Sequence, residues 1–158
     1  ILIGFGNRTV VTIDGAGEST SPPEAAGFTF PVPYDGTIEN LQVSADLLVA
    51  SAVFINVVGL QYDFTLIRAP SSQNGGIDQP APSYVSTPLT ASVHFGAPFN
   101  MVMSGTFRAA TASSTVPLAV YAGDRIGIRV KTAPNTNISA ADISQLSFSA
   151  TLTYVRAP

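Results

Sequence analysis

A single histidine, His94, limits the catalytic chemistry that this chain of 158 residues can perform. A Ser-His-Asp triad or a histidine-bound metal would have to be built on it. Its neighbours Val93 and Phe95 are apolar and take the opposite phase of an alternating segment. We therefore expect the imidazole to face solvent or a subunit contact, and we predict no catalytic residue and no enzyme activity.

Acidic side chains are the other candidates for chemistry. A calcium site would need several loop aspartates to converge, and their spacing matches no calcium-binding loop. Asp35 and Asp124 each adjoin a glycine, a pairing typical of tight turns. The sequence contains no paired-carboxylate motif of glycoside hydrolases and no glycine-rich phosphate loop. We expect no metal and no cofactor at the loop aspartates, which are Asp35, Asp63, Asp78 and Asp124.

The composition predicts that the chain associates with further copies of itself. Only 11% of the residues are charged and 46% are apolar, whereas roughly a quarter of an ordinary soluble protein is charged. Such a surface is most simply covered by further copies of the chain, in an obligate oligomer. The net charge is −3, with seven Lys and Arg in total. This balance argues against nucleic acid as a partner, because nucleic acid requires a basic stripe.

The length and the apolar runs favour one globular domain spanning residues 1–158. The longest uncharged run, Leu47–Tyr62, is shorter than the roughly 20 apolar residues of a membrane helix. We interpret it as buried strand and expect no membrane partner. The absence of cysteine excludes disulfides and thiolate chemistry. Because the chain opens in a strand-like segment, Ile1–Ile3, without an initiator Met, we expect it to be a fragment.

Apolar and polar residues alternate along much of the chain, which is the pattern of half-buried β-strands. Glycine- and proline-rich turns separate the alternating segments, and the chain has 12 prolines and 13 glycines. The pattern predicts one inward-facing row in each of the segments 41–47, 60–66, 89–95, 99–107, 126–130 and 146–154.

Three segments interrupt the strand pattern. Helix-forming residues in Ser44–Ile55 and a capping-box pattern in Ser139–Gln145 leave two short helices open as alternatives. Ala69–Pro88 is expected to be the longest loop. About eight to ten strands then predict an all-β, two-sheet antiparallel sandwich. The pattern alone leaves jelly-roll and immunoglobulin-like topologies both open.

Two segments near the end of the chain resemble a known trimeric fold. Tyr121–Val130 (YAGDRIGIRV) and Leu146–Tyr154 (LSFSATLTY) are similar to the last two strands of the complement- and tumour-necrosis-factor-like jelly roll. With Val32–Ile38 (VPYDGTI) and Ile3–Asn7 (IGFGN), they resemble the C-terminal head of Bacillus collagen-like exosporium glycoproteins. This resemblance touches most of the chain in order and selects the jelly roll among the sandwich folds.

The resemblance implies a structural role. It predicts a homotrimeric head at the tip of a collagen-like stalk, on the extracellular surface of bacterial spores in the exosporium or an appendage. The head would align and cap the stalk and present a durable outer surface. The stalk would lie upstream of this fragment and act as a partner in cis.

In trimers of this type, one sheet packs its second face against neighbouring subunits. For the last predicted strand, that face carries short hydroxyl side chains if the alternation has the expected phase, and two aromatic side chains if the phase is reversed. Both phases stay open at the level of sequence. The predicted trimer contacts are therefore Ser147, Phe148, Ser149, Thr151, Thr153 and Tyr154.

Two other functions are compatible with the sequence. An adhesin or fibre head would share the fold and bind a surface receptor or glycan through apical loops such as Ala69–Pro88. A hydrolase built on a β-sandwich would depend on His94. The structural head is the function that composition and resemblance favour together.

Overall fold

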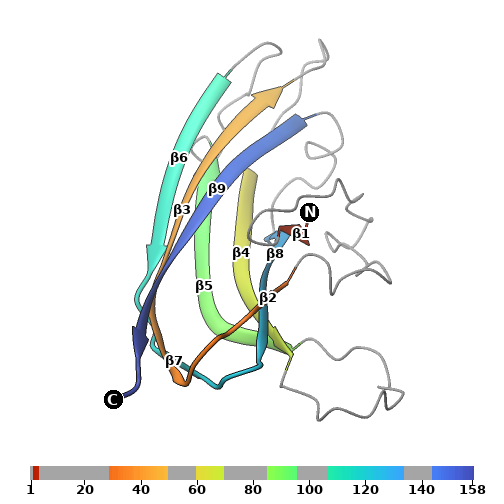
Figure 1. Ribbon diagram of the computed structural model, residues 1–158. Helices are drawn as coiled ribbons and strands as arrows, with labels where there is room; N and C mark the ends of the chain where they lie inside the picture. Colours follow the sequence, from red (N-terminus) through yellow and green to blue (C-terminus); the bar gives the residue numbers. More distant parts are fainter. Residues whose placement is uncertain (1, 4–28, 50–59, 70–84, 96–106, 134–143) are drawn as a thin grey trace, which may run out of the picture.

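Two antiparallel sheets make up the regular structure of the described residues in the computed structural model (Figure 1). No helix occurs among them, and none of them forms a segment that could cross a membrane as a helix. The structure describes residues 2–3, 29–49, 60–69, 85–95, 107–133 and 144–158.

The first sheet is built around the neighbouring strands β8 and β4, in the order β1-β8-β4-β5, and β2 also pairs with β8. Both short strands lie along β8, where Leu2 of β1 is opposite Arg129 and Phe30 of β2 is opposite Ile126. The strands of this sheet are β1 (Leu2–Ile3), β2 (Phe30–Pro31), β4 (Leu60–Ala69), β5 (Val85–Phe95) and β8 (Arg125–Thr132).

The second sheet is centred on β3, the longest strand. β9 pairs with β3 along almost its full length, from Gly36 opposite Arg156 to Val49 opposite Ser144. β6 and β7 both pair with β3 as well, over different parts of the strand. The register shifts between Ile38 and Asn40 on β3. The strands of this sheet are β3 (Gly36–Val49), β6 (Phe107–Ser114), β7 (Leu118–Val120) and β9 (Ser144–Arg156).

The core lies between the two sheets and is formed by their inward-facing apolar rows. Leu41 of β3 and Phe64 and Leu66 of β4 are fully buried, and removing such a side chain from water contributes about 1.5–3 kcal/mol. Phe64 also meets Phe148 of β9 edge to face, with ring centroids 4.8 Å apart. This contact joins the two sheets across the core.

The alternation predicted from the sequence is confirmed where the structure describes it. Inward residues of β3, β4, β5 and β8 are buried and those of β9 are half-buried, while most of their sequence neighbours are more exposed. The all-β, two-sheet antiparallel architecture is therefore correct. Of the predicted row 99–107, only Phe107, the first residue of β6, belongs to the described residues.

Neither of the two helices left open by the sequence occurs in the parts of the chain that the structure describes. Residues 44–49 are strand, not helix, because β3 is hydrogen-bonded to β6 on one side and β9 on the other, which overrides the helix propensity of Ala and Leu. Gln145 likewise belongs to β9, while 50–55 and 139–143 lie outside the described residues.

The predicted loop also ends earlier than Pro88, because β5 begins at Val85. Pro88 lies where the β4–β5 register shifts, opposite the stretch between Thr65 and Ile67 of β4. Among the described strands β5 pairs only with β4, so it is an edge strand, where a proline is tolerated. Ala69 belongs to β4, and 70–84 lie outside the described residues.

Glycine is required at two positions around one end of the sandwich. A Cβ atom on Gly36 would collide with the carbonyl oxygen of Val155 and with the ring of Tyr154, at 2.7 Å from the ring. Gly123 has φ of 86°, which other residues rarely adopt. These glycines let β9 approach β3 closely and let the chain turn sharply before β8.

Candidate functional site: the outer face of the second sheet

Short hydroxyl side chains cover the outer face of β9. Ser147, Ser149, Thr151 and Thr153 are all exposed and point away from the core, because they alternate with the half-buried residues that face it. The structure thus places these four predicted contact residues together on one accessible surface.

The register extends this surface across β3 and β6. Ser44 of β3 lies between Ser149 of β9 and Thr111 of β6, and Gln42 lies between Thr151 and Ser113. Residues in such rows are neighbours on one face of a sheet, so they form one polar surface. We call it the hydroxyl face, and it consists of Gln42, Ser44, Thr111, Ser113, Ser147, Ser149, Thr151 and Thr153.

The hydroxyl face is hollowed at its centre. The hollow has a volume of about 580 Å³, and six of the eight hydroxyl-face residues line it together with Val43 and Ala112. None of those six side chains is charged or longer than glutamine, so the backbone of the sheet is accessible to another surface. Asp46, half-buried in the next row between Ser147 and Ala109, is the nearest acidic residue along β3.

Phe148 and Tyr154, the other two predicted contact residues, face inward. Phe148 packs against Phe64 as described above, and the hydroxyl of Tyr154 donates to the carbonyl oxygen of Tyr34 at 2.6 Å. Both side chains are half-buried against the core. Of the two phases left open by the sequence, the structure has the one in which hydroxyl residues face outward.

His94 lies on the outer face of the first sheet, exposed and opposite Gln61 of β4. Nearby, the Ser92 hydroxyl donates to Asp63 Oδ1 at 2.7 Å, and Gln61 Nε2 donates to the same oxygen at 2.9 Å. A nucleophile–base–acid relay would need the imidazole between the hydroxyl and the carboxylate. Here the carboxylate holds the hydroxyl directly, so the three residues do not form a triad.

Sequence reasoning missed this Ser92–Asp63 contact, because the two residues are 29 positions apart and belong to no motif. The only available signal was that both occupy outward positions of adjacent alternating segments. Such a signal places them on one face but does not select the pair.

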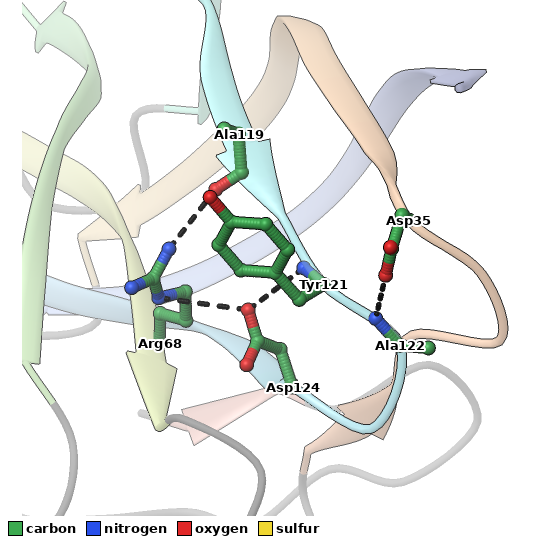
Figure 2. Close-up of polar contacts among 6 residues, drawn as sticks. All are labelled: Asp35, Arg68, Ala119, Tyr121, Ala122 and Asp124. Atoms are coloured by element: carbon green, nitrogen blue, oxygen red, sulfur yellow. Dashed lines mark hydrogen bonds and ion pairs between the residues drawn. The ribbon is translucent and has the colours of Figure 1, made fainter. Parts of the chain in front are cut away.

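Asp124 is the most buried acidic side chain among the described residues, and it closes the turn before β8 (Figure 2). Its Oδ2 accepts a hydrogen bond from the Tyr121 amide at 2.9 Å, and Arg68 Nε lies 3.7 Å from the same oxygen. Arg68 also donates to the carbonyl oxygen of Ala119 at 2.9 Å. The turn role predicted for Asp124 from its glycine neighbour is confirmed.

Asp35 binds a distant turn instead of its own, since its Oδ1 accepts from the Ala122 amide, 87 positions away, at 2.7 Å (Figure 2). Asp63 was predicted to lie in a loop but belongs to β4. Asp35, Asp63 and Asp124 bond to different groups, and the described residues contain no cluster of three or more His, Cys, Asp or Glu suited to a metal. Asp78, the fourth candidate, lies outside the described residues.

Comparison with known proteins adds no identification. No family model matches this sequence, and no curated protein matches it.

Proposed function

We propose that this domain is a structural, non-catalytic head that assembles as a homotrimer through the hydroxyl face. The observation that carries the proposal is the hydroxyl face itself: eight short, uncharged polar side chains on three adjacent strands, around a hollow of about 580 Å³. The face is broad and accessible, and its eight residues include no carboxylate, imidazole or amine that could act as an acid or a base.

The physical chemistry of the hydroxyl face is compatible with contact with another protein surface. Burying a charged side chain requires expensive desolvation, and interface cores are accordingly depleted of charge. Serine and threonine hydroxyls both donate and accept hydrogen bonds, so two such surfaces can satisfy each other on contact. Short side chains also lose little rotamer entropy when they are buried.

The order of the strands supports the jelly-roll form of the sandwich. The chain crosses from one sheet to the other between β2 and β3, and again between β3 and β4. β4 and β5 are paired in the first sheet. The chain then crosses to β6 and β7 in the second sheet, back to β8 in the first, and again to β9 in the second. A jelly roll has this kind of repeated crossing between two sheets.

The cellular role that we propose rests on the resemblance of the turn segments. Val32–Ile38 and Tyr121–Val130 resemble exosporium heads, and both segments meet at the turns that Asp35 and Asp124 stabilise. On this basis the trimer would cap a collagen-like stalk at the spore surface. Its durability would come from packing and association, because the chain has no cysteine to form disulfides.

Sedimentation equilibrium tests the assembly directly. We expect a species of three times 16.4 kDa at micromolar concentration. Ser149→Arg places a charge in the hollow and is expected to release folded monomer, whereas Ser86→Arg, at an exposed position of β5 in the other sheet, is expected to leave the trimer intact. A monomeric wild-type chain, or a trimer unaffected by Ser149→Arg, would contradict the proposal.

A further inference from the structure

β9 forms an open edge of the second sheet. It pairs with β3 along all 13 of its residues, and no described strand lies on its other side. At the opposite side of the sandwich, β5 and β6 lie beside each other and bring the two sheets together. No described strand of the first sheet lies as close to β9. Among the described strands, the sandwich is therefore closed at β5 and β6 and open along β9.

The apolar core is incompletely covered along this edge. The inward-facing side chains of β3 are buried, with exposed fractions of 0% for Leu41 and 1% for Leu47. The inward-facing side chains of β9 contact the same core but are only half-buried, and they are Leu146, Phe148, Ala150, Leu152 and Tyr154. A further strand beside β9 would cover this row and would also bond to the main-chain groups on its open side.

β9 lacks the features that protect an edge strand. Proteins prevent such strands from pairing with another chain by means of charged side chains, proline or bulges. β5 has two of these features, since Pro88 lies where the β4–β5 register shifts. From Ser144 to Val155, in contrast, β9 contains no charged residue, no proline and no glycine. The difference between these two outer strands indicates that β9 is the one suited to pairing.

We propose that the edge of β9 binds β9 of a second copy of the chain, antiparallel to it, so that the second sheets of two copies form one continuous sheet. Full overlap of the two strands fixes the register, because Ala150 lies midway between Ser144 and Arg156 and is then opposite Ala150 of the second copy. The contact has twofold symmetry, in which the same residues are used by both copies.

The residues of β9 suit this self-pairing. In the central register Phe148 lies opposite Leu152 of the second copy, and Ser149 lies opposite Thr151, so apolar residues meet apolar ones and hydroxyls meet hydroxyls. The only charged residue, Arg156, is at the far end of each strand and lies opposite the uncharged Ser144. No like charges are brought together, and the outward hydroxyl row of β9 continues onto the second copy.

This contact goes beyond the trimer proposed above and does not depend on it. The trimer uses the outer face of the second sheet, whereas the pairing uses its edge, so each copy in a trimer keeps an edge with which to join another trimer. A contact through one pair of strands is small compared with a stable interface. We therefore expect it to form only at protein concentrations well above those at which the chain sediments as a trimer.

Cysteine cross-linking tests both the contact and its register, because the chain has no cysteine of its own. Opposed residues of antiparallel strands have Cα atoms about 4.5–5.5 Å apart, which a disulfide can span. At high concentration under mild oxidation, we expect Ala150→Cys to form a covalent dimer on a non-reducing gel. Ala112→Cys is the matched control, because Ala112 is also a half-buried, inward-facing alanine but lies on β6. It should stay a single chain on the gel.

Hydrogen exchange of the wild-type chain tests the pairing without a substitution. Raising the concentration above that of trimer formation should slow exchange severalfold at β9 amides and leave those of β5 unchanged. Three results would overturn the proposal: no covalent dimer of Ala150→Cys, equal dimer formation by Ala112→Cys, or exchange at β9 that does not depend on concentration. Slow exchange at every concentration would mean that the same chain covers this edge. Loss of the trimer in Ser149→Arg would leave the Ala150→Cys dimer expected.

Discussion

Arg68 of β4 reaches across the sandwich and donates a hydrogen bond to the main-chain carbonyl oxygen of Ala119 on β7, at 2.9 Å. The two residues belong to opposite sheets, so this bond joins the sheets at one end, beyond the apolar core. The same guanidinium lies 3.7 Å from the buried carboxylate of Asp124. One side chain thus links β4, β7 and the turn that begins β8.

Arg68→Met should destabilise the domain by about 2 kcal/mol. The substitution keeps most of the aliphatic stem but removes the hydrogen bond to the Ala119 carbonyl oxygen and the ion pair with the Asp124 carboxylate, whose side chain is only 3% exposed. Urea unfolding followed by circular dichroism measures the free energy of unfolding. Arg156→Met is the matched control, because the Arg156 guanidinium lies over the exposed ring of Tyr34, 4.2 Å from its centroid. Loss of this exposed cation–π contact should cost less than about 1 kcal/mol. An equal loss of unfolding free energy in the two variants would contradict the prediction, because it would mean that the contacts of Arg68 stabilise the domain no more than an exposed cation–π contact does.

Phe148 and Ser149 are adjacent but face opposite sides of the second sheet, so substituting each one separates folding from the proposed assembly. Phe148→Ala removes the edge-to-face contact with Phe64 and should cost about 2 kcal/mol, less than for a fully buried ring because Phe148 is half-buried. Ser149→Ala should change the unfolding free energy of the monomer by less than about 0.5 kcal/mol. Urea unfolding at protein concentrations low enough for the chain to sediment as a monomer provides the comparison. A larger effect for Ser149→Ala would contradict the assigned phase of β9.

The sequence predicted that β9 has two faces but not which of them packs against the core. Alternation along Leu146–Tyr154 specified two sets of residues, since side chains of a strand alternate with a period of two. It did not say which set faces the core, because serine and threonine are compatible with either side. The structure decides the phase through Phe64, a residue of the opposite sheet that lies 84 positions before Phe148 (148 − 64).

Contacts between distant segments explain most of what sequence reasoning missed. Arg68 and Ala119 are 51 positions apart, and Tyr34 and Tyr154 are 120 apart. No local pattern encodes such pairs, because they arise only when the two sheets pack. The turn role of Asp124, in contrast, was predictable, since its partner Tyr121 is three residues away and Gly123 lies between them.

Tyr154→Phe should loosen the C-terminal segment without exposing the core. The Tyr154 hydroxyl donates to the Tyr34 carbonyl oxygen at 2.6 Å, and the Ala157 amide donates to the Asp35 carbonyl oxygen at 2.8 Å. Because Tyr34 and Asp35 are adjacent, the bond from Tyr154 holds in place the turn to which Ala157 is bonded. Its loss should cost about 1 kcal/mol. Amide hydrogen exchange at Ala157 should then accelerate roughly fivefold, by the same free energy. Tyr121→Phe is the control, since the contacts of Tyr121 described above are made by its main chain. Unchanged exchange at Ala157 in Tyr154→Phe would show that the C-terminal segment is held independently of the Tyr154 hydroxyl.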